Sequence, residues 1–118
     1  MFMARAKTFS LPVLHIMLAL SDGPRHGYAI KQAVEQRTDG EIRLGPGTLY
    51  EAIQRLEDTG LISETSPGEE ERVDGQKAQR RYYELTERGW VLLRSELQSL
   101  GQLIDAARTN PRLKKSLA

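Results

Sequence analysis

Apolar residues recur at helical spacing along most of this chain. Residues 10–21 are apolar on nearly every side, a pattern typical of a helix at the centre of a core. The D-G-P sequence at 22–24 predicts a turn. A second helix is predicted from about residue 26 to residue 37, with Ile30 and Val34 facing inward.

The stretch from 44 to 62, L-G-P-G-T-L-Y-E-A-I-Q-R-L-E-D-T-G-L-I, predicts a short helix with clear ends. Pro46 suits the first helical position, but Thr48 and Glu51 could instead form a capping box, which leaves the start open. Gly60 predicts a left-handed ending of the Schellman type. The apolar stripe is Leu49, Ala52, Ile53 and Leu56. So short a helix depends on tertiary packing for its stability. We therefore expect its apolar stripe to face the core, which leaves its polar face to meet either water or a partner.

The period then changes to that of a strand. Residues 61–65 and 80–85 are strand-like, and the polar residues 66–79 between them predict a loop. Together they predict a β-hairpin with a long tip. Tyr82 and Tyr83 point to opposite faces, so we expect one in the core and the other open to a partner.

A last helix, capped by Thr86, is predicted over 87–108. Its apolar positions recur at alternating spacings of three and four, which is a heptad-like seam: Trp90, Leu93, Leu97, Leu100, Ile104 and Ala107. Such a helix is roughly 33 Å long, longer than a core of three short helices can cover. We expect the seam to form a homodimer. Packing on the first helix is the alternative, and both can contribute.

With 118 residues, the chain is expected to form one domain with an appended helix. The apolar run at 11–20 is too short to span a bilayer, and no cleavage site follows it. We therefore expect a cytoplasmic protein without a membrane segment. The expected parts are a flexible arm (1–9), the main domain (10–85), the long helix (86–108) and a loose basic tail (109–118).

Charge and chemistry exclude several classes of function. The formal net charge is +1, so a nucleic-acid partner would have to meet a local basic patch. We find no nucleophile motif, phosphate-binding glycine loop or paired carboxylates, so we expect no enzyme and no cofactor. His15 and His26 lie on different predicted helices and the chain has no cysteine, so we expect no metal site.

These elements predict a mainly α protein with a small β hairpin, namely a winged helix-turn-helix plus a C-terminal dimerisation helix. Residues 44–62 resemble the recognition-helix signature of the PadR-like transcriptional regulators. R-R-Y-Y-E-L-T-E-R-G at 80–89 resembles their second wing strand, and H-G-Y-A-I at 26–30 the start of their second helix. The resemblance covers roughly residues 10–107 and is closest to the smaller subgroup with a single dimerisation helix.

The resemblance implies that the polar face of the 46–59 helix enters the major groove of DNA. We expect Gln54 to pair with adenine, Thr48 to bind a phosphate, and Tyr50 or Arg55 to contact a phosphate or a base. The expected phosphate contacts at the base of the wing are Lys77, Arg80 and Arg81. The alternatives are a solvated helix face and a strand edge protected by its charges. Family wings are usually short and basic, whereas this one has an acidic tip at 69–71.

The resemblance further implies a homodimer whose two heads lie about 34 Å apart on a palindromic operator. We expect a repressor that occludes a promoter. Some relatives respond to aromatic ligands near the dimer interface, so Trp90 could line a pocket for a small-molecule effector, although a packing role is the alternative. The competing function is a winged helix that binds another protein without sequence-specific DNA binding.

Overall fold

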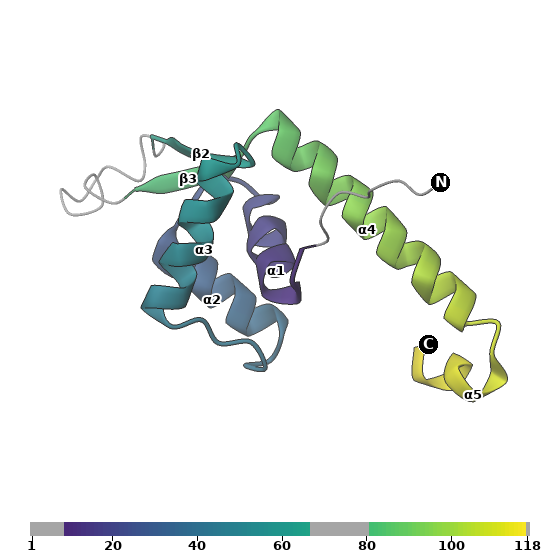
Figure 1. Ribbon diagram of the computed structural model, residues 1–118. Helices are drawn as coiled ribbons and strands as arrows, with labels where there is room; N and C mark the ends of the chain where they lie inside the picture. Colours follow the sequence, from purple (N-terminus) through teal and green to yellow (C-terminus); the bar gives the residue numbers. More distant parts are fainter. Residues whose placement is uncertain (1–8, 67–80, 118) are drawn as a thin grey trace.

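Three short helices and a small sheet form one end of the molecule, and a long fourth helix runs away from them (Figure 1). The computed structural model describes residues 9–66 and 81–117. The helices are α1 (Leu11–Leu20), α2 (Gly27–Arg37), α3 (Pro46–Asp58), α4 (Glu87–Ala107) and the short α5 (Pro111–Lys114), with a final 3₁₀ turn (Lys115–Leu117). The strands are β1 (Arg25–His26), β2 (Ile62–Thr65) and β3 (Tyr82–Leu85).

This order confirms the predicted fold class, a mainly α winged helix-turn-helix with an appended helix. The wing consists of β2, β3 and the residues between them. Lys77, Arg80, the acidic wing tip at 69–71 and the predicted arm at 1–8 lie outside the described residues. Phe9, which we assigned to the arm, packs against the core.

The first helix lies at the centre of the core, as its all-round apolar pattern predicts. Ile16, Met17 and Ala19 are fully buried, and α1 contacts α2, α4 and β3. Ser10 caps it by accepting a hydrogen bond from the Val13 amide at 3.3 Å. Burial of these side chains is what holds α2 and α3 around α1, since short helices are marginal on their own.

The ends of α3 resolve the choice that the sequence left open. Gly45 is the N-cap without a side-chain hydrogen bond and Pro46 occupies the first turn, so the capping-box reading was wrong. At the other end Gly60 adopts φ +79°. The Leu61 amide donates to the Leu56 carbonyl at 2.9 Å, and the Gly60 amide to the Glu57 carbonyl at 3.0 Å. These two bonds are the predicted Schellman ending.

The sheet has one strand more than the predicted hairpin. Its order is β1-β3-β2, and both pairs are antiparallel. Arg25 pairs with Tyr83 and His26 with Tyr82. A strand of two residues carries no detectable alternation, and its partner lies far away in the chain, so the sequence pattern could not reveal it.

The added strand helps to explain why both tyrosines of β3 are buried. Tyr82 is 4% and Tyr83 3% exposed, so the expectation that one would be open to a partner was wrong. The His26 ring packs edge-on against Tyr82 with 5.3 Å between ring centroids. Burial raises the pKa of the Tyr83 phenol above its usual value, and the nearby Glu57 carboxylate acts in the same direction. The phenol therefore stays neutral in the fold.

Residues 111–117, which we predicted to be part of a loose tail, form α5 and a 3₁₀ turn. Asn110 and Pro111 end α4 as expected, but they also begin α5, because Asn is a good N-cap and Pro suits the first helical position. The Asn110 side chain accepts from the Arg112 amide at 2.8 Å, and Arg108 donates to the Leu117 carbonyl at 3.1 Å.

Hydrogen bonds join the start of α4 to the end of α3. The Thr86 hydroxyl donates to the Gly60 carbonyl at 2.6 Å, and the Thr86 amide donates to the Leu61 carbonyl at 3.0 Å. The Arg88 guanidinium donates to the Thr59 carbonyl at 2.8 Å. We call this set of bonds the α3–α4 joint.

Replacement of Gly89 tests how tightly the joint is packed. Gly89→Ala should lower the free energy of unfolding by about 1–3 kcal/mol, because a Cβ there would collide with the Leu61 carbonyl, which belongs to the backbone. The control is Gly101→Ala in the same helix, where a Cβ meets no atom within 4 Å. It should be neutral or stabilising by up to about 1 kcal/mol. Urea unfolding at one protein concentration compares them, and equal stability of the two variants would contradict the close packing.

Candidate nucleic-acid interface

The third helix, α3, has one buried face and one exposed face. Leu49, Ile53 and Leu56 are buried in the core. Because successive residues turn by about 100°, Gln54 and Asp58 lie on the opposite side of the helix, and both are exposed. This outer face of α3 is the surface that the helix can present to a partner.

The residues predicted on α3 do not form one cluster. Thr48 and Arg55 line a groove of about 750 Å³ between α1, α3 and α4. Its apolar floor includes Val13 and Leu92. Tyr50 and Gln54 do not line this groove. The structure therefore divides the predicted set into an outer part and a part that faces α4.

Tyr50 is placed by its contact with α2. It is 50% exposed, yet its ring and hydroxyl lie directly against the Cα of Gly27, at the first position of α2. A side chain at residue 27 would occupy the same space. The absence of a side chain there lets the tyrosine lie across the start of α2, which fixes the contact between the two helices of the helix-turn-helix.

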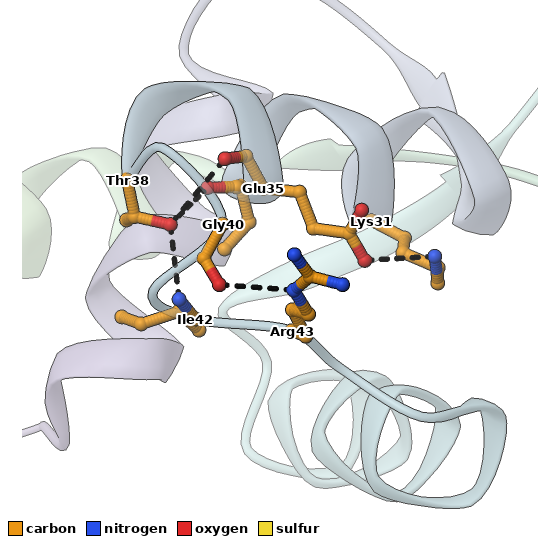
Figure 2. A network of polar contacts seen from close by, with 7 residues as sticks. Lys31, Glu35, Thr38, Gly40, Ile42 and Arg43 are labelled. Atoms are coloured by element: carbon orange, nitrogen blue, oxygen red, sulfur yellow. Dashed lines mark hydrogen bonds and ion pairs between the residues drawn. The ribbon is translucent and has the colours of Figure 1, made fainter.

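The connection between α2 and α3 is held by side chains as well as backbone (Figure 2). The Thr38 hydroxyl donates to the Val34 carbonyl at 2.9 Å and accepts from the Ile42 amide at 3.1 Å. The Arg43 Nε donates to the Gly40 carbonyl at 3.0 Å. These bonds hold Arg43 three residues before the first residue of α3.

Sequence reasoning missed the charged residues around this connection. Within the described residues, the exposed Arg43 has no ion-pair partner, and its guanidinium lies against Gly40. Lys31 lies 5.9 Å from the ring centroid of Tyr28, but its charge is balanced by Glu35 at 2.8 Å (Figure 2). The position of Arg43, a few residues before the predicted 46–59 helix, was the signal in the sequence that could have identified it as a candidate phosphate contact.

At the base of the wing, the structure describes one of the three predicted basic residues. The Arg81 Nε lies 3.4 Å from the Glu64 carboxylate on the neighbouring strand, and both side chains are largely exposed. An exposed pair of this kind is weak. Arg81 can therefore exchange Glu64 for a phosphate at little cost.

The predicted seam of α4 has a buried and an exposed half. Leu93 is 2% exposed and belongs to the core of its own chain, and Trp90 packs against that core. Leu97, Leu100 and Ile104 are exposed, and so is Leu103, which the heptad-like spacing did not identify. Only the half beyond Leu93 is thus open to a partner.

A comparison with known families matches residues 13–95 to the PadR-like family of transcriptional regulators. The chain belongs to this family. The match extends from α1 into α4 and includes the wing, the recognition helix and the α3–α4 joint. As a PadR-like regulator, the protein is a DNA-binding transcription regulator rather than an enzyme.

Two known proteins match about three quarters of this chain. The chain is 33% identical over 90 residues to the transcriptional regulator Rv3488 of Mycobacterium tuberculosis, covering 76% of each protein. It is 44% identical over 88 residues to an uncharacterized 37.1 kDa protein in transposon TN4556 of Streptomyces fradiae, which covers 75% of this chain. It spans only 22% of that protein.

Solved structures show the same fold. A PadR family transcription regulator from Clostridium difficile R20291 superimposes with a TM-score of 0.68 at 26% identity, covering 85% of this chain and 97% of that one. A PadR-like regulator from Bacillus cereus gives a TM-score of 0.66 at 20% identity over 82% and 87% of the two chains. The second likeness concerns the fold alone.

Two further findings concern membranes and metal ions. No helix in the described part of the chain has the length and apolar character to cross a membrane. Across 9–66 and 81–117, no three His, Cys, Asp or Glu side chains are grouped in a way that could hold a metal ion.

The contact between Gly27 and Tyr50 generates a prediction about DNA binding. Gly27→Ala should displace the Tyr50 side chain and weaken DNA binding several-fold, with a stability cost below about 1 kcal/mol because the far end of a tyrosine can swing away. Fluorescence anisotropy on a duplex selected by the wild type from a randomised pool measures the affinity. In a Tyr50→Ala background the same change should add nothing. An unchanged affinity of Gly27→Ala would remove Tyr50 from the interface.

Proposed function

We propose that this PadR-like regulator is a cytoplasmic homodimeric repressor that binds a palindromic operator through α3 of each copy. A small aromatic ligand releases it from the operator. The observation that carries this proposal is the exposed apolar half of α4, which extends beyond the head that contains the recognition helix (Figure 1).

Two apolar surfaces support a dimer. One is the distal half of α4, with Leu97, Leu100, Leu103 and Ile104 exposed. The other is the groove between α1, α3 and α4 with its apolar floor. A two-fold arrangement in which each chain covers these surfaces of the other would bury both at once, because the same patch then serves on each side. It would also set two copies of α3 at a defined separation.

The surroundings of α3 support its role in reading DNA. Gln54 lies on the outer face, within reach of base edges in a major groove. Arg43, in the connection before α3, and Arg81, next to the wing strand β3, are exposed and can bind phosphates. In the dimer the two α3 helices would lie about one helical turn of DNA apart, near 34 Å, which requires a palindromic site.

The α3–α4 joint supports control by a ligand. Because Thr86 and Arg88 bind the carbonyl groups at the end of α3, a change in the angle between two α4 helices would move both recognition helices. A ligand that binds one arrangement more tightly than the other would shift the dimer toward it. Trp90, half-buried near the start of α4, is the side chain we assign to an aromatic ligand pocket.

A second function has one observation in its favour. The α3 sequence P-G-T-L-Y-E-A-I-Q-R-L-E-D carries the acidic residues Glu51, Glu57 and Asp58 against the single basic residue Arg55. An acidic helix face repels phosphates and would suit a basic protein partner. The alternative is therefore a winged-helix module that binds protein without reading DNA sequence.

The salt dependence of binding separates these two functions. A dimer with about 6–10 phosphate contacts should lose roughly 10³–10⁵ in affinity for its selected duplex between 50 and 200 mM salt, because each contact releases counterions. Fluorescence anisotropy titrations across this range give the slope. Weak, flat binding to every duplex tested would favour the protein-interaction module.

The dimer is tested by a charge within the exposed half of α4. Leu97→Asp should convert the dimer to monomers, because burying an unpaired carboxylate in an apolar interface is strongly unfavourable. Sedimentation equilibrium measures the mass. The control is Gln98→Asp, which adds the same charge at an exposed neighbouring position off the seam and should leave the dimer intact. A Leu97→Asp protein that sediments as a dimer would show that α4 does not form the interface.

A further inference from the structure

The outer face of α3 contains a hydrogen bond that restricts one of its predicted base-reading side chains. Gln54 Nε2 lies 3.0 Å from Asp58 Oδ1, one helical turn away. A carboxylate can only accept hydrogen bonds. The NH₂ group of Gln54 must therefore face Asp58, and this decides an amide orientation that is otherwise a matter of interpretation.

This orientation determines which hydrogen-bonding groups remain for a partner. With one N–H bound to Asp58, the Gln54 amide still offers one N–H donor and the carbonyl oxygen as acceptor. In the major groove adenine presents one donor and one acceptor, whereas guanine presents two acceptors. The remaining pair of groups matches adenine and cannot donate twice to guanine.

Asp58 has opposing effects on the stability of α3, because its hydrogen bond to Gln54 one turn away is weakly stabilising and its charge is not. It is the last residue of α3, and a negative charge at a helix C-terminus is unfavourable because of the helix dipole. Among the described residues Asp58 has no ion-pair partner, and its hydrogen bond to Gln54 is the one side-chain interaction it makes there. These two effects on stability oppose each other, which leaves the defined contact between Asp58 and Gln54 as the feature available for a functional role.

We propose that Asp58 is a positioning residue that makes Gln54 select adenine over guanine. This rests on the proposed function, in which the outer face of α3 lies in a major groove. Asp58 does not touch the base. It holds the amide so that the acceptor and the remaining donor face the groove, and it removes the alternative orientation in which two N–H groups would be free for guanine.

The test uses duplexes selected by the wild-type protein from a randomised pool, with each A·T pair of the selected sequence replaced in turn by G·C. The wild type should show at one position in each half-site a preference for adenine of about fivefold or more, the range expected of a bidentate pair. Gln54→Ala should abolish this preference. Asp58→Ala should reduce it to within about twofold while affinity for all duplexes stays equal or rises, because a charge that repels phosphates has been removed.

Three variants separate positioning from other roles. Asp58→Asn keeps an oxygen that can accept from Gln54 and should retain most of the preference. Asp58→Ala added to Gln54→Ala should change the preference no further. Glu51→Ala removes the same charge from the same helix without a described bond to Gln54, so it should leave the base preference unchanged. Thermal melting by circular dichroism checks that each variant is folded.

The possible failures are distinguishable. If the wild type binds no duplex with a salt dependence, the proposed function fails and this inference with it. If binding is salt-dependent but Asp58→Ala keeps the adenine preference, only the positioning role is overturned. A change of preference at a position that Gln54→Ala does not affect would show that Asp58 reads a base itself, which also overturns the proposal.

Discussion

The carbonyl groups at the end of α3 are the point on which the rest of the structure depends. A helix C-terminus leaves its last carbonyls without helical partners. Here the Schellman turn at Gly60 satisfies the carbonyls of Leu56 and Glu57, and Thr86 and Arg88 bind the three carbonyls of residues 59–61. Two adjacent sets of hydrogen bonds thus end α3 and attach α4 directly after it. As a result, α3 and α4 are coupled by backbone carbonyls and not only by flexible side chains.

The three faces of α3 differ in their surroundings. Its inner face is buried and holds the helix in place, its outer face is exposed, and the flank with Thr48 and Arg55 faces the groove toward α4. In the proposed function, these faces would serve stability, DNA recognition and coupling to α4. In that proposal the acidic residues on α3 repel phosphates, so nearby cations such as Arg43 would supply the attraction.

Much of the fold could be predicted from the sequence because its causes are local. The period of apolar residues defined α1, α2, α3 and α4, and single residues at helix ends defined where they stop. Gly60 ends α3 as expected because glycine readily adopts a positive φ. Where two local signals competed, as with Pro46 and the Thr48–Glu51 pair, the sequence left both open. The tail was predicted as loose because Asn110 and Pro111 were interpreted only as an ending.

By itself, the sequence determined helices α1 to α4, most of their ends, the two wing strands and the family, because periodicity, capping and turn chemistry act between residues a few positions apart. Only the tertiary structure decided which side of each element is covered. It buried Tyr82 and Tyr83 together, placed Leu93 in the core while leaving Leu97 exposed, and separated Arg55 from Gln54 on one helix. Burial depends on which distant segment packs against an element, and no short stretch of sequence contains that information.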